Sequence, residues 1–333
     1  MTTTNGTNHR AAVFLFPGQG VQYPGMALDL VETGSAGVRE LFELASGIMG
    51  SDMAALLRDS DAETLKRGDL AQPAITLANL AAAALLGERG IRPLACAGHS
   101  LGEYAALQTA GIISQADCFT LVKHRGAAMQ RAAERLTAAG TTQAAGMAQA
   151  AGMAAVIGLE AERVESLLAE WKAGNAALEL YAANFNSPRQ TVVSGSAEAL
   201  ALAEERFKAA GARRVVPLRV AGPFHSPLIA AALEEFRPVL EGTAFREPRI
   251  PVYSNVTGER IASGAEAKSL ALEQITRAVR WTAVEGALQE AGPELVLEVG
   301  PGKVLQGLWK DSGNALPCYA AGTAAEIEHL FER

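Results

Sequence analysis

The chain has 333 residues, 49% of them hydrophobic and 20% charged, which is typical of a globular protein with a substantial core, and its net charge of −7 argues against a general nucleic-acid-binding protein. It contains no run of about 18 uninterrupted apolar residues, and its first ten residues lack the basic and then apolar pattern of a signal peptide, so we expect neither a membrane span nor such a leader. The three widely spaced cysteines, Cys96, Cys118 and Cys318, lack metal-binding spacing, which favours a reducing cytoplasm and predicts no metal site.

The first predicted element is a short apolar strand at 11–16, which ends in the glycine-rich turn Pro17-Gly18-Gln19-Gly20. The third glycine of a dinucleotide-binding fingerprint would fall at position 23, which holds Tyr23, so the turn is not a dinucleotide site. The strand instead delivers the side-chain amide of Gln19 to the loop. Taken alone, a glutamine here is more commonly a plain turn residue.

Helical patterns fill the chain between this turn and the next strand. Short ones occupy 26–70, and a longer helix is predicted at 74–86, with Pro73 acceptable in its first turn. Residues 87–93 close that helix and lead into a short apolar strand at 94–97.

The strand at 94–97 runs into Gly98-His99-Ser100-Leu101-Gly102, and the pattern Gly-x-Ser-x-Gly is typical of the sharp strand-to-helix turn called a nucleophile elbow. The two glycines let strand and helix pack closely, and the turn exposes Ser100 Oγ at the start of a helix. There the backbone N–H of Leu101 has no partner within the helix and can bind a developing oxyanion. An ordinary glycine-rich turn could hold the same residues, but the order of strand, turn and helix favours a nucleophile.

A second long helix is predicted at 114–136, where Ser114 and Asp117 have the spacing of a capping box with aspartate in place of glutamate. Arg125 lies in the middle of this helix in a mostly apolar setting. Taken alone, an arginine on a helix is most commonly a solvated surface residue. The Ala-, Gly- and Gln-rich segment 138–154 follows, and we interpret it as a flexible linker or loose helix at a domain boundary.

From residue 154 the predicted elements follow the order β-α-β-β-α-β of a split βαβ, or ferredoxin-like, unit. The strands and helices of this unit fall at 155–158, 161–171, 180–184, 190–194, 197–210 and 214–218. We therefore predict a small subdomain that is inserted into a larger one.

The chain returns to the larger unit through the loop 220–227, which contains His225. Gly300-Pro301-Gly302-Lys303 is not a phosphate-binding loop, because it lacks the four-residue spacer between the glycines and the Ser or Thr after the lysine. The remaining helices are predicted at 228–240, 272–291 and 304–310, and the remaining strands at 250–254 and 295–299.

A serine nucleophile needs a general base, most commonly a histidine, and the chain has only five. Two of them lie near the ends of the chain. His99 is adjacent to Ser100 and points its side chain elsewhere, and His124 lies on a helix without turn chemistry. His225 lies in a Gly- and Pro-bounded loop between a strand and a helix, where catalytic groups tend to sit. No acidic residue presents itself as a third member, so we expect a Ser100–His225 dyad with Nδ1 held by a backbone carbonyl or an amide; a structural histidine is the alternative.

With these residues in place, the chain resembles the malonyl-CoA:acyl-carrier-protein transacylases and the related acyltransferase domains of polyketide synthases, from about Val13 to Leu308. Together and in this order, the matching blocks are highly specific. They are Phe16-Pro-Gly-Gln-Gly20, Gln72-Pro73, Gly98-His-Ser-Leu-Gly-Glu103, His124-Arg125-Gly126, Asn184-x-Asn186-Ser187-Pro188, Pro223-Phe-His225, Asn255-Val256 and Glu298-Val-Gly-Pro-Gly302.

The resemblance implies an α/β fold, with a hydrolase-like core around a short parallel sheet and an inserted ferredoxin-like subdomain. The large subdomain would span 11–150 and 219–333, the small one would span 151–218, and the active site would lie in the cleft between them. Residues 138–152 depart from the family by being longer and richer in alanine, which affects the geometry of the junction and not the chemistry.

The resemblance also implies roles for the residues that match the family's reactive centre. Ser100 would be the acyl-accepting nucleophile and His225 its base, with the orienting carbonyl of the histidine near Gln274. Gln19 would share the oxyanion with the N–H of Leu101.

Three further residues match positions that contact the acyl group or lie near it in the family. Arg125 would bind the free carboxylate of malonyl. Phe224 is typical of malonyl-selective members, since methylmalonyl-selective ones usually carry a smaller residue there. Asn186 lies near the site in relatives, and its role stays open.

The implied reaction is ping-pong transfer of malonyl from malonyl-CoA to the phosphopantetheine thiol of acyl carrier protein through a malonyl-serine, without a cofactor beyond these substrates. We expect a cytoplasmic monomer without nucleic-acid or membrane partners. The alternatives are an acyl hydrolase that edits carrier proteins, an acyltransferase acting in trans for a polyketide synthase, and a non-catalytic docking module that keeps the fold. The presence of Arg125, which editing relatives tend to lose, and an intact set of reactive residues favour the transferase.

Overall fold

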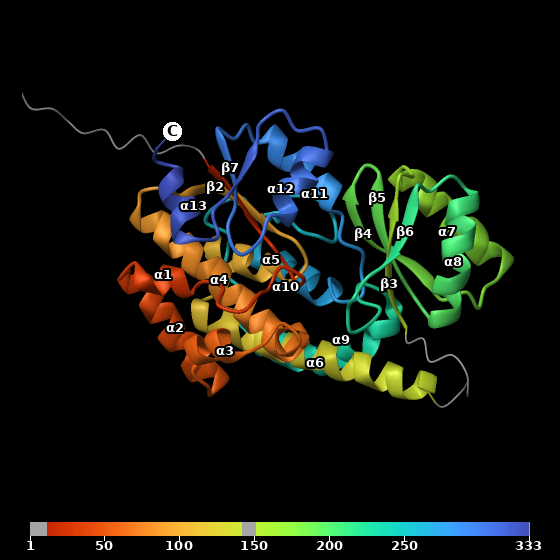
Figure 1. The fold of residues 1–333 in the computed structure, drawn as a ribbon, viewed down its shortest axis with the longest axis horizontal. Coiled ribbons are helices and arrows are strands. Elements are labelled where there is room, and N and C mark those ends of the chain that lie inside the picture. The colour runs from red at the N-terminus through yellow and green to blue at the C-terminus, as the bar shows by residue number, and fades with distance from the viewer. Residues whose placement is uncertain (1–11, 142–150, 333) are drawn as a thin grey trace, which may run out of the picture.

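The structure, a computed structural model, describes residues 12–141 and 151–332. Two sheets lie beside each other along the long axis of the molecule, each with its own covering helices (Figure 1). The α/β fold with a parallel sheet and a second, antiparallel sheet agrees with the predicted fold class. The predicted subdomain boundaries stay predictions.

The first sheet has four parallel strands in the order β2-β1-β7-β8. All residues of β1 are buried, as expected for a short apolar run in a parallel sheet that is covered on both faces. The strand ends that carry the glycine-rich turn and the serine therefore lie next to each other at one edge. The strands are β1 (Ala12–Phe16), β2 (Pro93–Gly98), β7 (Leu295–Glu298) and β8 (Cys318–Ala320).

Side chains of β1 alternate between two hydrophobic cores, one on each face of this sheet. Phe14 and Phe16 point into the main core, whereas Val13 and Leu15 pack in the core that also contains Trp281. The helices that line the main core are α1 (Leu28–Glu32), α2 (Ala36–Met49), α3 (Met53–Asp59), α4 (Gly68–Glu88), α5 (Gly102–Thr109), α6 (Gln115–Thr141), α9 (Ala230–Gly242), α10 (Gly264–Glu273) and α13 (Ala324–His329). The other face is covered by α11 (Trp281–Glu290) and α12 (Val304–Asp311).

The second sheet is antiparallel with the order β4-β5-β3-β6, which is the strand order of a ferredoxin-like unit. Its own core contains Val156, Val164 and Phe207, from the sheet and the two helices packed on it. The predicted β-α-β-β-α-β order is confirmed. The elements are β3 (Gly152–Ile157), α7 (Ala161–Gly174), β4 (Leu180–Ser187), β5 (Gln190–Gly195), α8 (Ala197–Ala209) and β6 (Arg214–Pro217).

The predicted linker at 138–154 lies partly outside the described residues. Of its described part, 138–141 continue α6 and 152–154 belong to β3. The start of α6 is as predicted, because Ser114 Oγ accepts from the Asp117 N–H at 3.0 Å and donates to its carboxylate at 2.7 Å.

The predicted helix at 272–291 is wrong, because the chain leaves the helix after Glu273 and re-enters it at Trp281. Between them, Val279 joins the edge of the second sheet: its N–H donates to Ala183 O and its carbonyl accepts from Phe185 N–H, both at 2.8 Å. These backbone bonds to a distant strand replace helical ones. The expected strand at 250–254 is likewise reduced to two isolated bridges, one between Val252 and Cys96 and one between Tyr253 and Arg260.

The placement of Pro73 in a first turn is also wrong. The helix α4 begins at Gly68, so the proline lies in its interior. A Cβ on Gly126 of α6 would come within 2.4 Å of the carbonyl oxygen of Gly68, so α4 and α6 pack closely there. This packing holds the residues before Pro73 in the helix. The helix lacks one backbone hydrogen bond at Pro73, because proline has no N–H.

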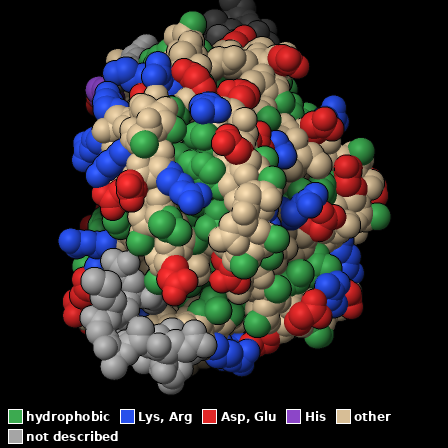
Figure 2. Space-filling view, turned by 90° about the vertical axis from the view of Figure 1, so that its right-hand side faces the viewer, with side chains coloured by type: hydrophobic (Ala, Val, Ile, Leu, Met, Phe, Trp, Pro, Cys, Tyr) green, Lys and Arg blue, Asp and Glu red, His purple; other side chains and the backbone are tan. Residues whose placement is uncertain are grey.

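α4 is also the one described helix that is long and apolar enough to cross a membrane, but 78% of its most apolar window is buried inside the protein, as in a core helix. On the outside, the face that carries α7 and α8 shows acidic and basic side chains interspersed with one another (Figure 2).

Candidate active site

Ser100 lies at the turn between β2 and α5, with a backbone φ of 52° in the left-handed region that is strained for a residue with a side chain. A Cβ on Gly98 would fall 1.9 Å from the carbonyl carbon of Gly102, and one on Gly102 would fall 2.0 Å from Phe16 O. Both glycines are therefore required by close backbone approach, as the elbow pattern predicts.

His225 follows the second sheet in the chain and also has a left-handed backbone, with φ of 56°. Its Nε2 lies 2.7 Å from Ser100 Oγ, and its Nδ1 lies 2.9 Å from Gln274 O and 3.2 Å from Arg277 O. Because both Nδ1 partners are carbonyl oxygens, Nδ1 carries the hydrogen and Nε2 is left to accept from the serine hydroxyl. The structure thus brings together the predicted pair, and a backbone carbonyl occupies the place of a third carboxylate.

The imidazole of His225 is buried and close to the guanidinium of Arg125. Burial, and then the positive charge of Arg125, lower the pKa of His225 to about 3, although the two carbonyls act in the opposite direction. The ring is therefore neutral near pH 7, which is the state in which it can take a proton from serine.

Arg125 is not the solvated surface residue that its helix position alone would favour. Its side chain is 1% exposed and lies over the ring of Tyr104, with 5.4 Å between the guanidinium carbon and the ring centroid. Nη1 donates to Gln72 Oε1 at 2.8 Å, while Nη2 donates to Gln274 Oε1 at 3.0 Å and lies 3.4 Å from Ser100 Oγ. Burial lowers the pKa of Arg125, and none of its described hydrogen-bond partners is a carboxylate.

Gln19 and Leu101 lie on the two segments that meet at the elbow. The place of a Cβ on Gly18 is 2.4 Å from His99 O and 3.6 Å from Leu101 N, so the glycine-rich turn passes directly against the start of α5. Within the described residues, the Leu101 N–H has no hydrogen-bond acceptor. The Gln19 amide accepts from Gln72 Nε2 at 3.5 Å and lines the same cavity as Ser100.

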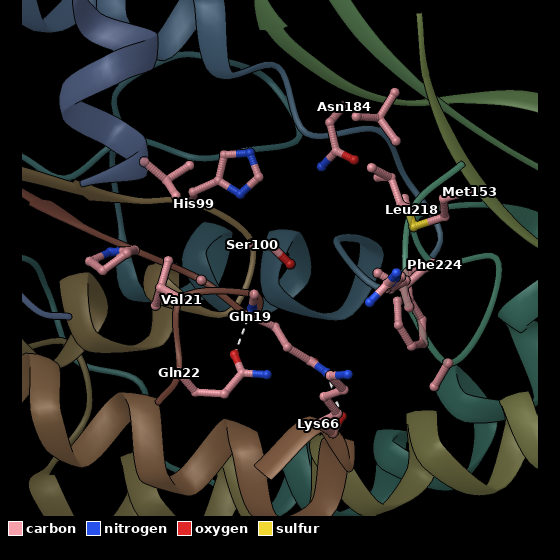
Figure 3. A pocket seen from close by; sticks show the side chains of 18 of the residues that line it. Gln19, Val21, Gln22, Lys66, His99, Ser100, Met153, Asn184, Leu218 and Phe224 are labelled. Carbon is pink, nitrogen blue, oxygen red and sulfur yellow. Dashed lines mark hydrogen bonds between the residues drawn. The ribbon is translucent and has the colours of Figure 1, made fainter. Parts of the chain in front are cut away.

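A cavity of about 710 Å³ opens over Ser100 between the two halves of the molecule. In Figure 3, Ser100 lies at its centre, with Asn184, Met153, Leu218 and Phe224 toward the second sheet. Gln19, Gln22 and Lys66 lie below the serine in the same view. The site therefore lies in the predicted cleft.

Phe224 and Asn186 both line this cavity. Asn186 Oδ1 pairs with His99 Nε2 at 2.9 Å, and the His99 ring packs edge-on against Trp281 with 5.3 Å between centroids. His99 is thus directed into the wall of the cavity and away from the serine hydroxyl.

Several buried polar residues hold the site without having been assigned a role from the sequence. Gln72 holds Arg125, and Asn255 accepts from the Ser100 N–H at 2.6 Å and donates to Gly98 O at 2.7 Å. Glu103 accepts from Gln274 Nε2 at 2.7 Å. All three belong to the blocks that carry the family resemblance, which was the one signal pointing to them. Within the described residues, no three His, Cys, Asp or Glu side chains group as a metal site.

Comparison with known proteins shows which family the chain belongs to. A model of the family described as "acyl transferase domain" matches residues 13–326. The chain is 36% identical over 315 residues to the malonyl CoA-acyl carrier protein transacylase of Bacillus subtilis, covering 95% of this chain and 94% of the relative. It is 37% identical over 320 residues to the protein of that name from Escherichia coli, covering 96% and 98%.

A solved structure is similar over nearly the whole chain. It is described as a type II PKS acyl-carrier protein in complex with its malonyl-transacylase, and it matches with a TM-score of 0.85 and 35% identity, covering 97% of this chain and 99% of that one. The malonyl-transacylase structure from Streptococcus pneumoniae matches with a TM-score of 0.87 at 31% identity, covering 96% and 99%.

Proposed function

The chain belongs to the acyl transferase domain family, and on that premise we propose that it transfers malonyl from malonyl-CoA to the phosphopantetheine thiol of acyl carrier protein, through a malonyl ester on Ser100. It is an acyltransferase, and relatives that match nearly its full length are named as malonyl transacylases. The observation that carries the proposal is the convergence of Ser100, His225 and Arg125 in one cavity.

In the first half-reaction, Ser100 Oγ attacks the thioester carbonyl while His225 Nε2 takes its proton, which the 2.7 Å contact supports. The C–S bond then breaks, and the proton leaves with the thiol of coenzyme A. The developing oxyanion is held by the N–H of Leu101 and the Gln19 amide. Removal of one such donor typically costs about 10²–10³ in rate.

In the second half-reaction, the phosphopantetheine thiol of the carrier gives its proton to His225 and attacks the ester carbonyl. The bond to Ser100 Oγ breaks, and the serine recovers the proton from the histidine. Coenzyme A leaves before the carrier reacts with the malonyl-serine, so the kinetics are ping-pong.

Arg125 selects the acyl group by pairing with the free carboxylate of malonyl, for which a guanidinium offers two parallel donors. An acetyl group would leave this buried cation unpaired, at a cost of several kcal/mol by analogy with broken buried ion pairs. Phe224 closes the same cavity and favours malonyl over branched relatives.

Mass spectrometry of the protein after exposure to malonyl-CoA tests the proposal. We expect a malonyl adduct on Ser100 that disappears when carrier protein bearing phosphopantetheine is added, with malonyl recovered on the carrier. The absence of an adduct would favour the docking module. Rapid release of coenzyme A without carrier would favour the editing hydrolase.

The carrier as partner is supported by the complex described for one structural neighbour. We further propose that the protein is a cytoplasmic monomer and that it needs no cofactor besides its two substrates. We prefer a carrier from fatty-acid synthesis, because the two curated relatives are named as malonyl CoA-acyl carrier protein transacylases without mention of a polyketide carrier. An enzyme acting in trans for a polyketide synthase is the second candidate, because the structural neighbour is described with a type II PKS carrier.

A further inference from the structure

A buried carboxylate next to the site takes no part in the proposed chemistry. Glu103, in the first turn of α5, is 1% exposed. Its Oε2 accepts two hydrogen bonds from segments far away in the sequence, from Gln274 Nε2 at 2.7 Å and from the Asn255 N–H at 3.1 Å. Removing a carboxylate from water costs free energy, so the burial of Glu103 against these two donors needs a physical reason.

The first contact fixes which way the Gln274 amide points. Its Nε2 faces the Glu103 carboxylate, and its Oε1 accepts from Arg125 Nη2 at 3.0 Å. An ionised carboxylate can only accept and a guanidinium can only donate, so a flipped amide would face an acceptor with its oxygen and a donor with its nitrogen. Glu103 and Arg125 therefore hold the amide in one orientation between them.

The same two segments hold the reacting residues. The backbone carbonyl of Gln274 accepts from His225 Nδ1 at 2.9 Å, and its Nε2 also donates to Ser100 O at 3.0 Å. The Asn255 side chain accepts from the Ser100 N–H at 2.6 Å. Nucleophile, base and guanidinium are thus each one hydrogen bond away from a residue that Glu103 holds.

We propose that Glu103 is a positioning residue for malonyl transfer: through Gln274 and Asn255 it sets the placement of Arg125, His225 and Ser100 relative to one another. This inference rests on the proposed function and deepens it. This positioning role requires a hydrogen-bond acceptor at the place of Glu103 Oε2, where the donors Gln274 Nε2 and Asn255 N–H converge.

Three substitutions separate this role from a structural one. Glu103→Met fills the space without an acceptor, Glu103→Ala removes the side chain, and Glu103→Gln keeps a carbonyl oxygen that can accept both bonds. The amide nitrogen of the glutamine would take the place of Oε1, which has no partner among the described residues. The matched control is Glu285→Ala, which removes another buried carboxylate, one that contacts Trp281 and Ser312 and not Gln274.

The experiment measures kcat/KM for malonyl-CoA and for acetyl-CoA with carrier protein, together with the thermal midpoint of each variant. For Glu103→Met and Glu103→Ala we expect kcat/KM for malonyl-CoA to fall by about 10- to 100-fold, the usual effect of losing a hydrogen bond to a charged group. Because only malonyl uses Arg125, the malonyl-to-acetyl ratio should fall as well. Glu103→Gln should stay within about threefold of the parent, since it keeps both bonds. Glu285→Ala should keep the kinetics even where its midpoint falls.

Kinetics of Glu103→Met equal to those of the parent would overturn the inference, and so would a Glu103→Gln variant as impaired as Glu103→Met. An equal loss for malonyl and acetyl would overturn the placement of Arg125 by Glu103, because Arg125 serves only the malonyl substrate. If Glu103→Ala does not fold, the methionine and glutamine variants still decide. Failure of the parent protein itself to transfer malonyl would refute the proposed function instead, so the two failures are distinguishable.

Discussion

Replacement of Arg125 by methionine is the sharpest test of how the site recognises its acyl group. Methionine keeps an unbranched chain of similar reach on α6 but removes the guanidinium that lies 3.4 Å from Ser100 Oγ. Gln72 and Gln274 lose their donor in this variant, and the cavity loses its buried positive charge.

The structure sets the size of the expected effect. Arg125 is almost fully buried and its nearest partners are neutral, so an incoming carboxylate would be its first contacting anion. Loss of one partner from a buried, hydrogen-bonded ion pair costs about 3–5 kcal/mol, which corresponds to a decrease in kcat/KM for malonyl-CoA of roughly 150- to 5,000-fold. Transfer of acetyl should rise, because the neutral acyl group no longer faces an unpaired cation.

The assay is a competition between malonyl-CoA and acetyl-CoA for Ser100, read by mass spectrometry of the acyl-enzyme and by steady-state transfer to carrier protein. Arg131→Met on the same helix is the matched control, since Arg131 is exposed and pairs with Glu235 on the surface. That variant should behave like the parent. A malonyl preference that survives Arg125→Met would refute the assignment of the carboxylate site.

Three further changes probe the rest of the site. Gln19→Ala should slow release of coenzyme A in the first turnover by about 10²–10³, measured by stopped flow, and an unchanged rate would remove the Gln19 amide from the oxyanion hole. The base acts in its neutral form, and burial lowers the pKa of His225 to about 3. When kcat/KM is measured from pH 8 to pH 5, we therefore expect no decline with an apparent pKa near 6.5, the ordinary value for histidine. A decline centred near pH 6.5 would contradict a neutral, buried ring. Gly98→Ala, whose Cβ would lie 1.9 Å from backbone, should lower the thermal midpoint by about 10 °C or more, whereas Gly47→Ala, with open space around it, should not, and equal midpoints would show that the elbow tolerates a side chain.

The parts of the site that depend on local turn chemistry could be predicted from the sequence. The elbow needs glycines at fixed offsets from Ser100, and these are visible in the sequence as Gly98 and Gly102. The base followed by elimination, since few histidines exist and only His225 lies in a suitable loop. The absence of a suitable acidic residue correctly indicated that something other than a carboxylate would hold Nδ1.

The break between α10 and α11 could not be predicted in the same way. Residues 274–280 carry no proline or glycine, and their helical pattern continues on both sides. The break comes from pairing of Val279 with β4, a strand about one hundred residues away in the sequence, and this pairing also places Gln274 O beside His225. The pairing of Val279 with β4 therefore explains both why the prediction of a continuous helix at 272–291 is wrong and why the Gln274 carbonyl lies beside His225.

The burial of certain polar side chains is the second feature that the sequence pattern did not reveal. Gln72 lies on α4 and Glu103 lies in the first turn of α5, and at such positions these residue types normally favour the helix and remain solvated. Only the packing of α4 against α6 and the return of the chain near Asn255 remove them from water. Burial is a property of the assembled fold, and a window of sequence does not contain it.

The site is also where the described structure departs most from what is locally favourable. Apart from Ala27, the only described non-glycine residues with positive φ are Ser100 and His225, and each such conformation costs about 1–3 kcal/mol. Arg125 adds a buried cation whose described hydrogen-bond partners are neutral, and Glu103 a carboxylate whose pKa burial raises to about 7. Such costs persist only where surrounding contacts over-determine the geometry, and here the hydrogen bonds that Gln72, Gln274 and Asn255 accept from the site residues do so. Their coincidence around one serine hydroxyl locates the reactive centre by a physical criterion that is independent of the Gly-x-Ser-x-Gly motif.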